Sequence, residues 1–139
     1  MYHKIIIVGN LGRDPEMRYT SDGTPVTNFS VATNRRWTNA DGSPGEETVW
    51  FRVSAWRRLA ETCNEYLQRG RLVLVEGRLQ PDDRGGPRIF TRNDGTAGAS
   101  FEVTAMSVKF LGGRGEAPPA AMPGAPEEPP AEAGEEIPF

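Results

Sequence analysis

The chain has 139 residues, of which 37% are hydrophobic and 25% are charged, and its formal net charge is -3. This length suits one domain with a hydrophobic core and is short for two. The strongly apolar run near the start, Ile5 to Val8, is too short for a secretory signal or a membrane span, so we expect a cytosolic protein. One cysteine, Cys63, and one histidine, His3, exclude a disulfide framework and a zinc cluster.

The charge is unevenly distributed along the chain. Residues 1–111 carry 15 Lys and Arg against 13 Asp and Glu, a net charge of +2, whereas residues 112–139 carry one Arg and six Glu, a net charge of -5. A mildly basic body joined to an acidic tail indicates a nucleic-acid partner for the body and a protein partner for the tail.

Residues 2–11 predict a first strand that is apolar on both faces, with Ile5 and Ile7 on one face and Ile6 and Val8 on the other. One face should fill the core of the domain. The other should meet a second subunit, with an intrachain cover as the alternative. A short edge strand is expected at residues 16–20, followed by a turn at 21–25.

Residues 26–37 predict the second strand, which ends in Arg35-Arg36-Trp37. The polar connection at residues 38–47 is longer than a tight turn requires. Trp37 should therefore lie near the base of a projecting hairpin loop.

The third predicted strand, residues 48–56, carries the strongest functional signal. Trp50, Arg52 and Trp56 fall on the polar face, where two indoles flank a guanidinium. Such a face suits unpaired bases, since every base has a π-face and every nucleotide a phosphate. The alternative is that other parts of the chain cover the tryptophans, but two of them beside an arginine favour the functional interpretation. The core face carries Val49, Phe51, Val53 and Ala55.

After residue 56 the apolar period becomes helical, with Leu59, Cys63 and Leu67 on one stripe and Gly70 as a C-terminal stop. We expect this helix to close one end of a curved sheet. A nucleophilic pair of Cys63 with His3 is formally possible, but a cysteine on the apolar stripe is better explained as a core residue.

Residues 71–79 predict the fourth strand, with Leu72 and Leu74 on an outer face that should be covered by another subunit or a loop. Its inward residues should be Val73, Val75, Gly77 and Leu79.

The long segment 81–98 predicts a hairpin whose tip, centred on residues 88–92, reaches away from the body and presents Phe90 between two arginines. An equally supported alternative is that Ile89 and Phe90 pin this segment to the body. Residues 99–111 predict the last strand, in which a change of apolar parity indicates a bulge near Ala105.

Residues 112–139 contain seven prolines and five glycines and have no periodic apolar face, a composition that predicts disorder. The last five residues break this pattern, because two acids precede an aliphatic residue and a terminal aromatic residue. Such a peptide suits a basic groove with an apolar pocket. This tip consists of Glu135, Glu136, Ile137, Pro138 and Phe139.

Five strands with one helix between the third and the fourth is the order of the OB-fold, a Greek-key barrel that binds oligonucleotides and oligosaccharides. Over essentially its whole length the chain resembles the bacterial single-stranded DNA-binding protein (SSB) family. The segments that carry the resemblance are residues 5–15, 50–53, 59–60, 66–67, Gly70, 76–79 and the tip at 135–139.

The resemblance implies an all-β OB-fold domain at residues 1–111 and a disordered tail at 112–139 whose tip docks partner proteins. It assigns base stacking to Trp37, Trp50 and Trp56. The fourth aromatic of the family lies on a loop that is longer here than in the best-known members, and Phe90 is the most plausible residue for this position. It also implies a homotetramer whose dimers pair through the first strand. A bacterial, nucleoid-associated protein of the cytoplasm, with no cofactor, is expected.

Within this hypothesis, single-stranded DNA binds without strong sequence preference and is protected, and the tip recruits replication, recombination and repair proteins. An RNA-binding OB protein is a rival interpretation, which the tip disfavours. An enzyme is a weaker rival, because the sequence has no Gly-Lys-Ser/Thr phosphate loop and no convincing nucleophile-base pair. The residues expected to neutralise phosphates are Lys4, Arg13, Arg18, Arg35, Arg36, Arg52, Arg57, Arg78, Arg88 and Arg92.

Overall fold

The computed structural model describes residues 1–112. The predicted tail after Gly112 and its terminal tip lie outside the described residues. In chain order the elements are β1 (Ile5–Leu11), β2 (Glu16–Tyr19), β3 (Pro25–Thr38), β4 (Pro44–Trp56), α1 (Arg58–Tyr66), β5 (Leu72–Leu79), β6 (Arg88–Thr91) and β7 (Ala97–Leu111).

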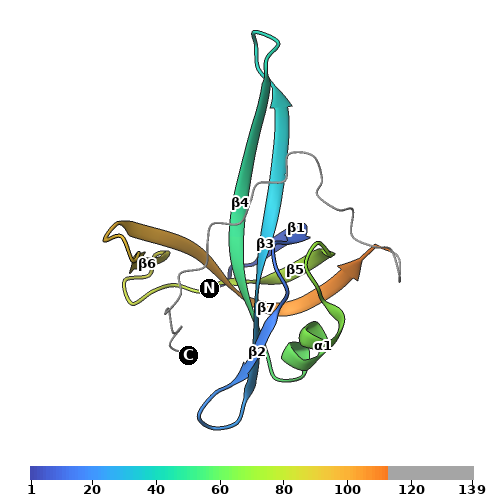
Figure 1. The fold of residues 1–139 in the computed structure, drawn as a ribbon, viewed down its shortest axis with the longest axis vertical. Helices are drawn as coiled ribbons and strands as arrows, with labels where there is room; N and C mark the ends of the chain where they lie inside the picture. Colours follow the sequence, from blue (N-terminus) through green and yellow to red (C-terminus); the bar gives the residue numbers. More distant parts are fainter. Residues whose placement is uncertain (113–139) are drawn as a thin grey trace.

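Five of the strands form a closed barrel (Figure 1). The order around the barrel is β1, β5, β7, β4 and β3, and β3 pairs back with β1 at Asn10↔Ala32 and Leu11↔Val31. The β4–β7 pairing is parallel and the other pairings are antiparallel. Because α1 lies between the third and fourth barrel strands, the predicted OB-fold order is confirmed. The predicted edge strand is β2, which pairs with β3.

Barrel closure depends on a close approach and on a bulge. A Cβ added at Gly9 would lie 2.2 Å from the backbone oxygen of Ala32, so only glycine fits where β1 meets β3. In the β5–β7 ladder, Glu76 pairs with Ser107 and Gly77 pairs with Ala105. Met106 is therefore left as an extra residue on β7. This is the bulge that the sequence predicted near Ala105, and bulges bend a strand as barrel closure requires.

Alternate residues of the barrel strands fill the interior, as the period of two predicts. Helix α1 closes one end of the barrel and packs mainly against β3 and β4 (Figure 1). Cys63 is fully buried on α1, and burial raises the pKa of its thiol to about 12, so it stays protonated at neutral pH, as a core residue does. Fully or almost fully buried residues of the barrel strands include Ile7, Phe29, Val31, Val53, Val73, Val75 and Val103.

The helix is shorter than the sequence predicted. It ends at Tyr66, and Leu67 is already extended and buried, so Gly70 is not its C-terminal cap. Gly70 has a φ of 88° and instead joins the returning chain to β1, where its N–H donates to the carbonyl of Leu11 and its carbonyl accepts from Asn10. Within residues 1–112, no helix is long and apolar enough to cross a membrane.

The second face of β1 is open. Ile6 is 60% exposed and Val8 is 49% exposed, and their neighbour Leu72 on β5 is 36% exposed. Residues 1–112 therefore do not supply the intrachain cover that was the alternative to a second subunit. We call Ile6, Val8, Leu72 and Leu74 the open β1–β5 face.

Three predicted details of strand placement are wrong. The first strand begins at Ile5 rather than at Tyr2. Leu79, expected to point inward, is 44% exposed because it lies at the very end of β5. Residues 88–91 are not the tip of a hairpin but a strand, β6, which pairs with the start of β7 from Arg88↔Ser100 to Thr91↔Ala97.

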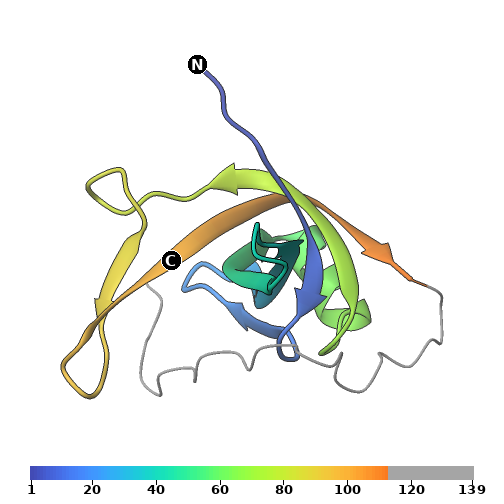
Figure 2. The same ribbon diagram turned by 90° about the horizontal axis from the view of Figure 1, so that it is seen from above.

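Two hairpins project from the barrel in different directions (Figures 1 and 2). The first, which we call the finger, comprises residues 34–48 and is a ladder up to its last pair, Thr38↔Pro44. Trp37 therefore lies beside the closing turn. The prediction that it lies near the base of the hairpin is wrong, because the two strands extend through residues that were expected to form the loop. The second, the β6 arm, comprises residues 80–100 and turns at residues 92–96.

Candidate nucleic-acid interface

Strand β4 separates a core face from an outer face, as its alternating sequence predicts. Val53 and Ala55 are fully buried, while Trp50, Arg52 and Trp56 are partly exposed on the opposite side. The tryptophans therefore belong neither to the buried core nor to a fully open surface. A partly exposed ring leaves a surface on which a base can stack.

The neighbouring strands extend this outer surface. On β3, the small residues Ala32 and Ser30 stand opposite Trp50 and Arg52, so no bulky side chain of β3 faces them directly. On β7, Glu102 pairs in register with Arg52.

Two further basic residues join the surface. Arg18 on β2 stands opposite Val26, which in turn stands opposite Trp56. Arg78 on β5 stands opposite Thr104 of β7. By strand register, the structure thus places five of the predicted residues on the same face of the sheet, which we call the sheet face: Trp50, Trp56, Arg18, Arg52 and Arg78.

Trp37 is held in a fixed position near the end of the finger. Its indole N–H donates to Oδ1 of Asn39 at 2.8 Å, and the guanidinium carbon of Arg35 lies 4.6 Å from the ring centroid. The ring packs against Gly45 on β4, where an added Cβ would lie 2.3 Å from Cε2. Trp37 keeps 37% of its surface exposed.

Both arginines of the finger are paired with acids across the hairpin. Nε of Arg35 lies 2.7 Å from Oε1 of Glu47, and Nε of Arg36 lies 3.6 Å from Oε1 of Glu46. The sequence analysis did not predict these ion pairs, although the spacing of the residues could have shown them. Both pairs are symmetric about residue 41, as cross-strand neighbours in an antiparallel hairpin centred there must be. Exposed pairs of this kind contribute only about 0 to 1 kcal/mol, so a phosphate can compete with them.

Phe90 lies on the β6 arm and packs within that arm. An added Cβ at Gly98 would lie 2.6 Å from the ring, and the guanidinium carbon of Arg92 is 5.6 Å from the ring centroid. Phe90 is partly exposed and Ile89 is 60% exposed. The alternative that both residues pin the arm to the body therefore does not describe Ile89.

The remaining predicted basic residues lie apart from the sheet face or are paired. Nζ of Lys4 lies 3.0 Å from Oε2 of Glu76 on the β1–β5 side, and the hydrogen bond that Lys4 donates to this carboxylate raises the pKa of Lys4. Arg13 follows β1, and Arg57 precedes α1 with a φ of 58°, a conformation that costs a non-glycine residue energy. Arg88 pairs with Glu102 on β7 at 3.6 Å. The phosphate-binding role of these residues stays a prediction.

The described part of the chain contains no cluster of side chains that could bind a metal ion. Among residues 1–112, no group of three or more His, Cys, Asp or Glu side chains is arranged to hold a metal ion.

Comparison with known sequences places the chain among similar proteins. The model of the single-strand binding protein family matches residues 2–111. The single-stranded DNA-binding protein of Neisseria meningitidis is 41% identical over 114 residues, which are 82% of this chain and 62% of that protein. The corresponding protein of Wolinella succinogenes is 39% identical over 83% of this chain and 67% of its own length, and single-stranded DNA-binding protein 1 of Chlorobaculum tepidum is 45% identical over 81% and 66%. The match thus spans about two thirds or less of the length of these relatives.

Solved structures show the same fold. The Plasmodium falciparum SSB in complex with single-stranded DNA superimposes with a TM-score of 0.66 at 24% identity, over 81% of this chain and 97% of that one. A deletion mutant of the single-stranded DNA-binding protein from Thermus aquaticus superimposes with a TM-score of 0.61 at 28% identity, over 81% of this chain and 51% of that one.

Proposed function

The chain belongs to the single-strand binding protein family, and from this premise we propose that it binds single-stranded DNA through its sheet face. The observation that carries the proposal is the pair of partly exposed tryptophans, Trp50 and Trp56, that flank Arg52 on the outer surface of β4. Stacking on these rings does not read the edges of bases, so the main binding surface has little sequence preference. Duplex DNA binds poorly, because its bases are already stacked and paired.

In this mechanism, bases stack on Trp50 and Trp56, and the strand continues to Trp37 on the finger and to Phe90 on the β6 arm. The arginines of the sheet face neutralise phosphates, and Arg35 and Arg36 exchange their acidic partners for phosphates. Affinity falls as salt rises, with a slope of about 0.7 per phosphate neutralised. RNA offers bases for stacking and phosphates for the arginines in the same way. The rival interpretation, an RNA-binding protein, is therefore tested by comparing the affinities of the chain for DNA and RNA oligomers of matched sequence.

The test of the stacking role is alanine substitution of Trp50 and Trp56, singly and together. Each stack contributes about 1 to 3 kcal/mol, so each single variant loses about 5- to 150-fold in affinity for labelled oligo-dT, measured by fluorescence anisotropy. Tyr66→Ala is the matched control, because Tyr66 is an exposed aromatic residue on α1. Unchanged oligo-dT binding by the double variant contradicts the proposal.

The tail supplies the second half of the proposed function. Its terminal tip, residues 135–139, recruits replication, recombination and repair proteins to protected DNA at the nucleoid, and the acidic tail competes weakly with DNA for the basic body. The basis is the net charge of -5 after residue 111 and the acidic-to-apolar order of the tip. Deleting residues 135–139 should abolish retention of such proteins on the immobilised chain and spare or slightly strengthen DNA binding at low salt. Markedly weaker DNA binding contradicts this division.

The active form in this proposal is a homotetramer whose dimers pair through β1. The support is the open β1–β5 face, which presents Ile6 and Val8 to solvent in a single chain. Contiguous exposed apolar side chains of this kind mark protein interfaces.

A further inference from the structure

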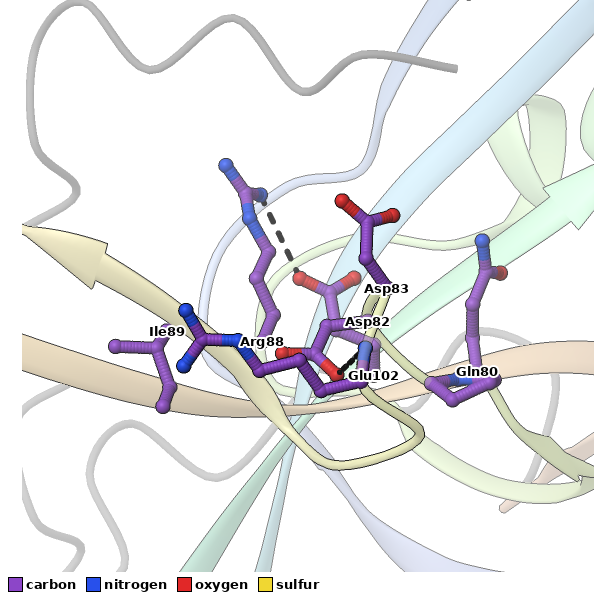
Figure 3. A pocket seen from close by; sticks show the side chains of 8 residues that line it. Gln80, Asp82, Asp83, Arg88, Ile89 and Glu102 are labelled. Carbon is purple, nitrogen blue, oxygen red and sulfur yellow. Dashed lines mark hydrogen bonds and ion pairs between the residues drawn. The ribbon is translucent and has the colours of Figure 1, made fainter.

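A pocket of about 530 Å³ lies where the end of β5 meets β6 and β7 (Figure 3). This volume is within the range of sites for small ligands. The pocket has no role in the stacking mechanism. It is lined by Gln80, Pro81, Asp82, Asp83, Arg84, Arg88, Ile89 and Glu102.

One wall of the pocket is a turn that is held by its own aspartate. Oδ1 of Asp82 accepts hydrogen bonds from the backbone N–H groups of Arg84 and Gly86, both at 2.9 Å. The bonds from Gly86 and Arg84 lower the pKa of Asp82, so its carboxylate stays ionised and keeps the turn closed. This wall therefore has a defined shape without a ligand.

The pocket also contains a carboxylate that is nine-tenths buried. The side chain of Glu102 is 10% exposed, and its Oε1 lies 3.6 Å from Nη1 of Arg88 and 3.1 Å from the hydroxyl of Ser100, which donates to it. A carboxylate offers about four acceptor sites, so these contacts leave it able to accept from a ligand. An arginine and a carboxylate are thus held side by side in one cavity.

Glu102 connects this pocket to the sheet face, because it pairs in register with Arg52 of β4. Gln80, another residue of the pocket, is also linked to β7, because the hydroxyl of Thr104 donates to its amide oxygen. A strand that runs over Trp50 and Trp56 therefore passes the edge of the pocket.

The charges in the pocket decide what kind of group enters it. Asp82, Asp83 and Glu102 against Arg84 and Arg88 give a net charge of -1, which disfavours a phosphate. A neutral group that has donors on one edge and acceptors on the next is the complement of a carboxylate beside an arginine. Adenine and cytosine place a single amino donor beside an acceptor, whereas guanine places two adjacent donors, N1–H and the N2 amino group, beside its acceptor O6. Guanine is therefore the base that can engage both oxygens of a carboxylate while its O6 and N7 accept from arginine.

We propose that this pocket binds one unstacked guanine base of the bound strand, with Glu102 accepting from N1–H and the N2 amino group and Arg88 donating to the acceptor edge. The proposal rests on the single-stranded DNA binding proposed above and adds a base preference at one position. Thymine is disfavoured there, because its single N3–H lies between two carbonyl oxygens that the carboxylate repels.

The experiment compares the affinities of the full chain for all-dT oligomers and for the same oligomers with one internal dG, and uses the ratio as the readout. The wild type should favour the dG oligomer by at least about fivefold, in line with one bidentate base contact. Replacing dG by deoxyinosine, which lacks the N2 amino group, should reduce the ratio. Glu102→Gln should bring the ratio to about one while oligo-dT binding persists.

Glu65→Gln is the matched control, because it makes the same charge change at an exposed position of α1, and it should keep the ratio. A wild-type ratio of one overturns the proposal, as does an unchanged ratio in Glu102→Gln. An equal rise in affinity for both oligomers in Glu102→Gln alone, with the ratio kept, also overturns it and indicates a phosphate in the pocket. Failure of oligo-dT itself to bind contradicts the proposed function instead.

Discussion

Trp37 illustrates how a single glycine can set the position of a candidate stacking residue. The ring packs directly on the backbone of Gly45, and its N–H is committed to Asn39. Any side chain at position 45 would occupy the space of the indole. The finger thus holds Trp37 in one place before any ligand arrives, which lowers the entropy cost of stacking a base on it.

Replacing Gly45 with alanine should weaken binding of oligo-dT by displacing the indole. The new Cβ would lie 2.3 Å from Cε2 of Trp37, so the ring must move. The loss should be at most that of one stack, about 1 to 3 kcal/mol, measured by titration of the variant against wild type. Gly86→Ala is the control, because its Cβ would meet its nearest neighbour only at 3.9 Å. Equal affinities of Gly45→Ala and wild type would remove Trp37 from the binding surface.

At the scale of elements, the finger is less basic than its Arg35-Arg36 pair suggests. Glu46 and Glu47 of β4 lie opposite these arginines and neutralise them. The finger therefore offers phosphate-binding groups that must first leave an acid. Its contribution to affinity depends on how readily this exchange occurs.

Changing Glu46 and Glu47 to glutamine should raise the affinity for single-stranded DNA at low salt. Each substitution removes a competitor of the phosphate and adds one unit of positive charge, and exposed pairs of this kind are worth about 0 to 1 kcal/mol, so each gain is up to about fivefold. The salt dependence of binding should steepen by about 0.7 per additional phosphate contact. A fall in affinity would instead mean that the glutamates position the arginines.

Strand alternation predicted the fold because each barrel strand has one face in the core. Val53 and Val75 both stand on the predicted inner faces and are buried. The bulge near Ala105 was also readable, since a bulge shifts the parity of apolar residues.

Other features depend on long-range register, which a local pattern does not contain. The pairing of Arg52 with Glu102 joins two parallel strands that are 50 residues apart in the chain, so the acid on the sheet face was not foreseen. The strand β6 has only four residues, too few for a periodic signal. The position of Trp37 was misjudged because Pro44 and Gly45 read as loop residues, although they pair with β3.

At the scale of the whole molecule, the open β1–β5 face is the surface that a single chain leaves unfinished. Ile6 and Val8 are 60% and 49% exposed on a strand whose other face is in the core. If the tetramer forms through β1, a charge at this face must be buried without a partner, which is costly.

Ile6→Asp should therefore dissociate the assembly into smaller species, as measured by sedimentation velocity. Ile89→Asp is the matched control: Ile89 has the same 60% exposure but lies on the β6 arm, and its variant should keep the wild-type mass. A tetramer of Ile6→Asp with wild-type stability would place the interface elsewhere.

The central claim is that the indoles of the sheet face meet the bases of single-stranded DNA. Its most direct test is a titration of intrinsic tryptophan fluorescence with oligo-dT and with duplex DNA of matched length, each at two salt concentrations. Strong quenching by the single strand alone, weakened by salt, is the predicted result. Absence of quenching by either DNA would contradict the claim and return Trp50 and Trp56 to a structural role.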